Sequence, residues 1–147
     1  MHEKPGYWLI VASRDHVLAG KEKSFVQVSH GKPTPLEKME AGDWIVYYSP
    51  KLKYNGSRAC QRFTAIARIS GEDVFQVSMS ENFKPFRKKV EFLENIHEIE
   101  VKPLIPKLDF VKDKEHWGLA FRNGFRHISK KDFMLICQKM STDSSAE

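Results

Sequence analysis

The sequence predicts an α+β fold: a small curved sheet or barrel of about six strands, with short helices at its periphery. Short β-rich segments recur along the chain, and they do not alternate with the long helices that parallel βαβ architectures require. Hydrophobic residues make up 41% of the 147 residues, which is enough for a substantial core. This length fits one domain, expected over residues 1–140, and the small polar residues 141–147 are expected to form a disordered tail.

The N-terminal segment is expected to form a buried strand followed by a short helix. Residues 7–12 (YWLIVA) are apolar throughout, a pattern typical of a strand covered on both faces. Ser13 is a favourable N-cap for a helix over residues 14–20, in which Val17 and Leu18 are expected to face inward.

The following segments predict a second strong strand. A short extended piece is expected at residues 25–28, and Thr34 is expected to cap a helical turn that runs through Met39. After a tight turn at Gly42, residues 44–48 (WIVYY) form a strand candidate, because aromatic and β-branched residues favour strands. A polar, basic loop follows, with an Asn-Gly turn signal.

Further strands are expected in the second half of the chain. The alternation over residues 63–69 predicts a half-buried strand with Phe63, Ala65, Ala67 and Ile69 on one face. Two more strands are expected at residues 75–79 and 87–92. Residues 101–110 contain two prolines and predict a connector with one helical turn, and the last strand is expected within residues 121–128.

The C-terminal helix has the clearest pattern. Ser129 is its expected N-cap. Apolar residues follow at the i, i+3, i+4, i+7 spacing of an amphipathic helix: Phe133, Ile136, Cys137 and Met140. The sheet and this helix together account for the predicted α+β class.

The charge of the chain favours a polyanionic partner, and its hydropathy argues against a membrane protein. Lys and Arg number 24 against 19 Asp and Glu, and the formal charge of +5 mildly favours a polyanionic partner. No apolar run approaches the roughly 18 to 20 residues of a membrane helix. The first apolar stretch is too short for a signal peptide. We therefore expect a cytoplasmic protein without membrane association, and a monomer is the favoured state.

Motifs for cofactors and metals are absent from the sequence. Neither GxGxxG nor GxxxxGK[ST] occurs, so the usual backbone cradles for nucleotide phosphates are missing. The histidines form no HxH or HExxH, and Cys60 and Cys137 form no CxxC pair. We expect no cofactor and no metal, and we expect both cysteines to be buried thiols.

Three residue groups resemble catalytic sites but have simpler structural interpretations. Ser13, Asp15 and His16 are sequence neighbours, whereas the members of a triad converge from different directions. Ser29-His30 and His116-Trp117 lack any specific spacing. No residue is therefore assigned as catalytic, and binding is favoured over catalysis.

The ordered segments resemble the EVE domain over roughly residues 6 to 140. The resemblance rests on residues 7–17 (YWLIVASRDHV), 25–32 (FVQVSHGK) and 35–51 (PLEKMEAGDWIVYYSPK). It continues through 61–67 (QRFTAIA), 83–87 (FKPFR), 116–118 (HWG) and 121–124 (FRNG). The family implies a PUA-like β-barrel with peripheral helices, similar in fold to the YTH and ASCH domains. It also implies binding of RNA or modified DNA through a pocket for one modified or flipped base.

The expected pocket lies between three segments: the loop after the first strand, residues 27–30, and the end of the strand at residues 48–50. Ser13 and Gln27 are expected to hydrogen-bond the base edge, and aromatic rings are expected to stack on the base. The expected pocket residues are Ser13, Arg14, Gln27, Ser29, His30, Tyr48, Ser49, Pro50, Phe83 and Trp117.

Basic residues near this site are expected to contact phosphates, although a solvated surface is the alternative for each. The expected cations are Lys51, Lys53, Arg58, Arg87, Lys88 and Lys89. The loop that begins at Lys51 and Lys53 is the best candidate, because Tyr54 lies among its charges.

Two other functions stay open on sequence grounds. The first is an enzyme of the ASCH-like type acting on a nucleoside or amide substrate, which predicts a perturbed Lys, Glu or His in the pocket. The second is a protein-interaction module, which predicts an exposed apolar patch. A nucleic-acid-binding module remains the leading interpretation.

Overall fold

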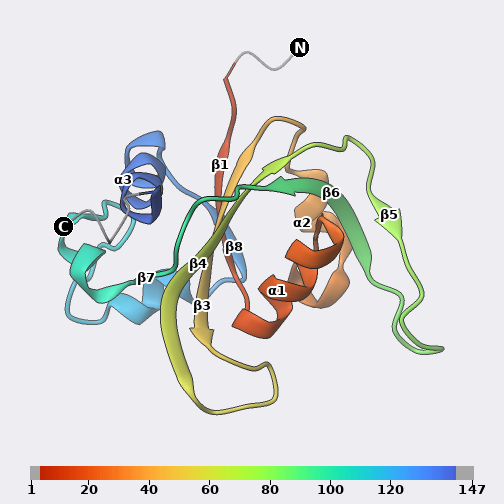
Figure 1. The fold of residues 1–147 in the computed structure, drawn as a ribbon, viewed down its shortest axis with the longest axis horizontal. Helices are drawn as coiled ribbons and strands as arrows, with labels where there is room; N and C mark the ends of the chain where they lie inside the picture. Colours follow the sequence, from red (N-terminus) through yellow and green to blue (C-terminus); the bar gives the residue numbers. More distant parts are fainter. Residues whose placement is uncertain (1–3, 142–147) are drawn as a thin grey trace.

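The computed structural model describes residues 4–141 as a curled mixed sheet flanked by short helices (Figure 1). Six strands form its continuous path in the order β2-β6-β4-β3-β1-β8, while β5 pairs with β6 and β7 with β4. The strands are β1 (Tyr7–Val11), β2 (Phe25–Val26), β3 (Trp44–Lys51), β4 (Ala59–Ile69), β5 (Phe75–Gln76), β6 (Phe86–Phe92), β7 (Ile99–Glu100) and β8 (Phe125–His127). The predicted α+β class with a curved sheet is confirmed.

The helices are short and lie at the periphery of the sheet. In Figure 1, α1 and α2 lie on one side of strands β1, β3 and β4, and α3 lies on the other. The α-helices are α1 (Arg14–Lys23), α2 (Pro33–Glu37) and α3 (Lys130–Ser141). The 3-10 helices are η1 (Ser29–Gly31), η2 (Lys102–Lys107) and η3 (Trp117–Phe121).

Two hydrophobic cores cover the two faces of the sheet. Side chains alternate between them along β3, since Ile45 and Tyr47 belong to one core and Val46 and Tyr48 to the other. The first core contains Val46 and Tyr48 and is closed by η2, η3 and α3. The second core contains Ile45 and Tyr47 and includes Val17 of α1. Covering on both faces explains the continuous apolar runs in β1 and β3.

A bulge in β4 changes which side chains face each core. Tyr47 pairs with Ala65 but Tyr48 pairs with Phe63, so Thr64 is an additional residue on the β4 side. Phe63 consequently packs in the first core, whereas Ala65 packs in the second. The expectation that both lie on one face of a half-buried strand is wrong, because the bulge breaks the period of two.

Asp43 fixes the turn that leads into β3. Its carboxylate accepts the backbone N–H of Gly6 at 2.8 Å, the indole N–H of Trp8 at 3.0 Å and the backbone N–H of Glu40 at 2.9 Å. Asp43 is buried, and Gly42 before it adopts a positive φ of 95°. This pattern joins the turn to the start of β1, which pairs with β3 in parallel.

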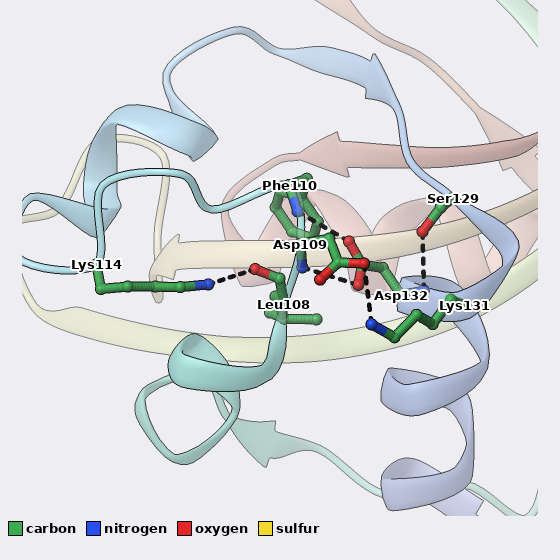
Figure 2. A network of polar contacts seen from close by, with 7 residues as sticks. All are labelled: Leu108, Asp109, Phe110, Lys114, Ser129, Lys131 and Asp132. Carbon is green, nitrogen blue, oxygen red and sulfur yellow. Dashed lines mark hydrogen bonds and ion pairs between the residues drawn. The ribbon is translucent and has the colours of Figure 1, made fainter.

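A second buried carboxylate fixes the C-terminal helix (Figure 2). Asp132 accepts the backbone N–H groups of Asp109 and Phe110, both at 2.9 Å. The backbone N–H of Asp132 donates to the hydroxyl of Ser129 at 3.1 Å, which confirms the predicted N-cap. The predicted inward face is confirmed as well, since Phe133, Ile136 and Met140 are buried.

Several local expectations need correction. Helix α1 extends to Lys23, and Leu18 is 42% exposed rather than inward-facing. Helix α2 begins at Pro33 with Lys32 as its N-cap, so Thr34 is not the cap. The strands expected at residues 75–79 and 121–128 are only two and three residues long. Ser141 ends α3, and the rest of the expected tail lies outside the described residues.

Candidate functional site

The tip of the β3–β4 hairpin meets helix α1 and η1 in a surface cluster of rings. The ring of Tyr54 stacks on His16, with centroids 4.9 Å apart and an interplanar angle of 16°. His30 approaches Tyr54 edge-on at 6.2 Å, and the ammonium of Lys51 lies 5.7 Å from the Tyr54 centroid. We call these four residues and Asp15 the Tyr54 cluster. It combines exposed aromatic rings with the ammonium of Lys51 at one end of the sheet.

Asp15 holds the hairpin against the start of α1. Its carboxylate accepts the backbone N–H of Tyr54 at 3.1 Å and that of His16 at 2.9 Å. In return, the backbone N–H of Asp15 donates to the carbonyl of Leu52 at 3.0 Å. The hydroxyl of Ser13, the N-cap residue of α1, also donates to this carboxylate, at 2.6 Å. The cluster is therefore positioned by contacts between segments about 40 residues apart.

The hydrogen bonds also keep Asp15 ionised. Partial burial raises the pKa of its carboxyl, but the hydrogen bond from Ser13, the charge of His16 and the backbone N–H groups of Tyr54 and His16 outweigh this effect. The net result is a pKa below the ordinary range for aspartate. The site therefore carries a fixed hydrogen-bond acceptor beside its rings at neutral pH.

A second group of aromatic and basic residues lies on the arm between β5 and β6, residues 77–85. Phe83 is 39% exposed there, and a Cβ placed on Gly31 would lie 3.6 Å from its ring. Arg87, at the base of the arm, donates to the side-chain oxygen of Gln27 at 2.9 Å and lies 3.7 Å from the ring centroid of Phe25. Burial lowers the pKa of Arg87 from its ordinary value.

The structure brings several of the expected pocket residues together at this end of the sheet. Ser13 contacts Asp15 of the Tyr54 cluster directly, and His30 is itself a member of the cluster. Arg14 follows Ser13, but its guanidinium forms an ion pair with Glu98 at 2.8 Å. Pro50 is exposed on β3 just before Lys51. Ser29 lies in η1 next to His30, and its side chain is outside the described set.

Three other expected pocket residues lie elsewhere. Tyr48 is 2% exposed and packs in the first core, with its ring 4.2 Å from that of Phe121. Burial and the charge of Cys60 raise the pKa of Tyr48 to about 12. Ser49 is fully buried and shares a hydrogen bond of 2.8 Å with Thr64. Trp117 packs edge-on against Phe121 in the same core, on the face of the sheet opposite α1.

The expected phosphate-binding residues divide into surface and interior positions. Lys53, Arg58 and Lys89 are exposed, and Lys51 is half-buried beside Tyr54. Lys88 is 3% exposed and donates its ammonium to the carbonyls of Leu36 and Met39, so it is a buried structural cation rather than a surface one. Burial lowers its pKa, against the raising effect of Asp43 and three other nearby acidic groups.

Sequence reasoning missed the two residues that form the ring stack. In the sequence, His16 stands out only as a neighbour of Ser13 and Asp15, and in the structure the hydroxyl of Ser13 donates directly to Asp15. The sequence marks Tyr54 as an aromatic residue among lysines, but it does not place Tyr54 in the expected pocket. That interleaving of one ring with Lys51 and Lys53 was the available signal.

Within residues 4–141, no group of three or more His, Cys, Asp or Glu side chains is arranged to hold a metal ion. Both cysteines in this region are free thiols of intermediate burial. None of the described helices has the length and apolar character needed to span a membrane.

Known bacterial proteins are similar to this chain in sequence over most of its length. It is 45% identical over 128 residues to a UPF0310 protein of Bacillus licheniformis, covering 87% of this chain and 86% of that protein. It is 42% identical over 139 residues to a UPF0310 protein of Mycolicibacterium gilvum, covering 95% and 98%. These relatives share nearly the full length of the chain.

Solved structures give the same fold at much lower identity. The YTH domain of the Zygosaccharomyces rouxii MRB1 protein, in complex with N6-methyladenosine RNA, superposes with a TM-score of 0.63 at 13% identity. The match covers 98% of this chain and 90% of that one. At this identity the likeness shows the fold alone, and it agrees with the expected PUA-like architecture. The sequence model of the EVE domain family matches residues 6–139, and the chain therefore belongs to this family.

Proposed function

We propose that this protein is a nucleic-acid-binding module that holds one modified or flipped base of RNA or modified DNA at the Tyr54 cluster. The observation that carries the proposal is the exposed His16–Tyr54 ring stack, positioned by Asp15 and edged by His30. The fold supports it, because a structural neighbour was solved in complex with N6-methyladenosine RNA.

Ring stacking supplies the main attraction. Removing a base from its stack costs a few kcal/mol, least where the strand is already single. Stacking on an aromatic side chain returns about 1–3 kcal/mol per base. A base that stacks on Tyr54 replaces the ammonium of Lys51, whose contact with the exposed ring contributes only about 0.5–1 kcal/mol. Lys51 then pairs with the phosphate of the same nucleotide.

Asp15 provides a hydrogen-bond acceptor beside the rings, which can distinguish one base from another. Its carboxylate is an acceptor without a proton to donate, since its pKa is lowered. Such an acceptor favours a base with an exocyclic amino group, as aspartate and glutamate do when they accept from the amino group of cytosine. The proposed ligand is therefore an amino-bearing base, with or without a modification.

Surface cations near the hairpin provide attraction without base selection. Lys53 and Arg58 are exposed on the β3–β4 hairpin, and Lys51 lies beside Tyr54. Phosphate contacts by such residues release counterions, so binding weakens as salt rises. A salt dependence alone identifies only a basic surface, and base selection must be tested separately.

The test is a titration with short single-stranded and duplex oligonucleotides at two salt concentrations. The oligonucleotides carry one 5-methylcytosine, 5-hydroxymethylcytosine, N6-methyladenine or unmodified base. We expect one modified single strand to bind tightest, and we expect Tyr54→Ala to weaken it by about 5- to 100-fold. Tyr54→Phe keeps the ring and should bind nearly as the unaltered protein does.

A matched pair of histidine variants controls for nonspecific effects. His16→Ala removes the ring stacked on Tyr54, whereas His116→Ala removes an exposed histidine from the segment before η3. Only the first is expected to weaken binding. Equal affinity for all strands, unaffected by Tyr54→Ala, would contradict the proposal.

A further inference from the structure

We infer that Phe83 is a second stacking position, for the nucleotide adjacent to the base at the Tyr54 cluster, so that the protein recognises a short single strand rather than an isolated base. This inference rests on the proposed function. It adds a ligand position on the β5–β6 arm, residues 77–85, which is a separate element from the hairpin that carries Tyr54.

Two consecutive residues of η1, His30 and Gly31, link the Tyr54 cluster to the arm that carries Phe83. His30 meets the edge of Tyr54, and Gly31, the next residue, lies directly against the arm. A Cβ added to Gly31 would lie 3.6 Å from the ring of Phe83 and 2.4 Å from the side chain of Pro85. Of the elements of the fold, only η1 therefore has to lie between the Tyr54 ring and the arm that carries Phe83.

The arm presents Phe83 in a defined conformation. The backbone N–H of Met79 donates to the carbonyl of Phe83 at 2.9 Å, and Ser80 and Phe83 form a β-bridge. The backbone N–H of Val77 donates to the carbonyl of Pro85 at 3.0 Å and closes the base of the arm. A backbone held in this way loses little conformational freedom when a base stacks on Phe83.

The surroundings of Phe83 suit a polyanion with flat apolar groups. Phe83 and Met79 are 39% and 59% exposed, which is high for large apolar side chains. Lys32 and Lys84 are exposed in the same region, whereas Glu81 is the acidic residue of the arm. Exposed rings interleaved with cations are the usual construction of single-strand binding surfaces, in which bases stack and phosphates pair.

Arg87 anchors this surface at its base. Its guanidinium lies on the ring of Phe25, is fixed by Gln27 and also contacts the sulfur of Met79 at 3.2 Å. A cation held by three partners is positioned in advance, so it contributes a local positive potential with little ordering cost. We therefore assign the expected phosphate contact of Arg87 to the nucleotide at Phe83 rather than to the base at Tyr54.

The test compares trinucleotides that carry the preferred base in the middle with the same trinucleotides in which the neighbouring bases are abasic. The abasic ligands keep every phosphate and sugar and lose only the neighbouring bases. For the unaltered protein we expect abasic substitution to weaken binding by about 5- to 100-fold. For Phe83→Ala we expect the intact trinucleotide to bind as weakly as the abasic one, and abasic substitution to cost nothing further.

Controls separate this inference from the proposed function. Met134→Ala removes an equally exposed apolar side chain from α3 and should leave both ligands unaffected. If Tyr54→Ala weakens binding but Phe83→Ala behaves as the unaltered protein, the second position is disproved and the proposed function stands. If neither variant changes binding, both are disproved. Retained far-ultraviolet circular dichroism verifies that each variant folds.

Discussion

The carboxylate of Asp15 accepts the backbone N–H of Tyr54, which lies 39 residues further along the chain in the β3–β4 hairpin. This contact positions the Tyr54 ring on His16 and close to His30. The same carboxylate accepts a hydrogen bond from the hydroxyl of Ser13 at the start of α1. One exposed acidic residue therefore organises the proposed base-binding site.

Replacing Asp15 should loosen the hairpin without unfolding the domain. In Asp15→Ala, the amide of Tyr54 loses its acceptor, and we expect it to exchange with solvent faster. The free energy of unfolding should fall by only about 1 kcal/mol, since one exposed hydrogen-bonding site is lost. Hydrogen exchange followed by NMR measures the first effect and urea denaturation the second.

Asp113→Ala is the matched control for this variant. Asp113 also accepts a backbone N–H, that of His116 at 3.0 Å, but it lies in the segment before η3. Its replacement should leave the exchange of the Tyr54 amide and oligonucleotide binding unchanged. Slow exchange at Tyr54 in Asp15→Ala would show that the hairpin is held by other contacts.

The pH dependence of stability follows from the lowered pKa of Asp15. A carboxyl whose pKa is lower in the folded chain stabilises the fold above its unfolded pKa, about 3.9. That contribution disappears as the pH falls through the lower folded value. The stability difference between the unaltered protein and Asp15→Asn should therefore shrink below about pH 4. A constant difference from pH 7 to pH 2, measured by urea denaturation, would refute the assignment.

Asp132 should be much more important for stability than the exposed ion pair beside it. Asp132→Ala leaves the buried N–H of Phe110 and the partly buried N–H of Asp109 without their acceptor, and we expect a loss of roughly 2–4 kcal/mol. Lys131→Ala removes only the exposed pair with Asp109 and should cost less than about 1 kcal/mol. Denaturant unfolding of both variants measures the two values, and similar losses would contradict this ranking.

Gly31 should tolerate no side chain. Its φ of +84° is unfavourable for other residues, and an added Cβ would lie 2.4 Å from that of Pro85. Gly31→Ala should therefore destabilise the protein by more than about 1 kcal/mol and weaken trinucleotide binding, because η1 and the arm are pushed apart. Gly118→Ala is the control, since an added Cβ there meets nothing within 4 Å. Equal melting temperatures for the two variants would overturn this account.

Local patterns in the sequence predicted much of the fold. The apolar runs that became β1 and β3, and the helical spacing after Ser129, depend on neighbours within one element. The bulge at Thr64 was not predictable, because it appears only when β4 is aligned with β3. The bulge turns the side chain of Phe63 to the face of the sheet opposite that of Ala65, so the two residues pack in different cores.

The candidate site was harder to predict than the fold. Tyr48 and Tyr54 are both aromatic residues near the same basic loop, yet one packs on Phe121 in the core and the other stacks on His16 at the surface. Lys88 lies in a run of three cations, and only its contacts with the carbonyls of Leu36 and Met39 distinguish it from its neighbours. These differences arise from contacts between segments distant in sequence.

The most direct test of the central claim is an NMR titration of the isotope-labelled protein with an unlabelled trinucleotide that carries the preferred base. The account predicts that the largest shifts occur at the backbone amides of Asp15, His16 and Tyr54, with smaller shifts at Phe83. The amides of η3 around Trp117, on the opposite face of the sheet, should stay unchanged. Largest shifts at η3, or none at Tyr54 under saturating ligand, would contradict the account.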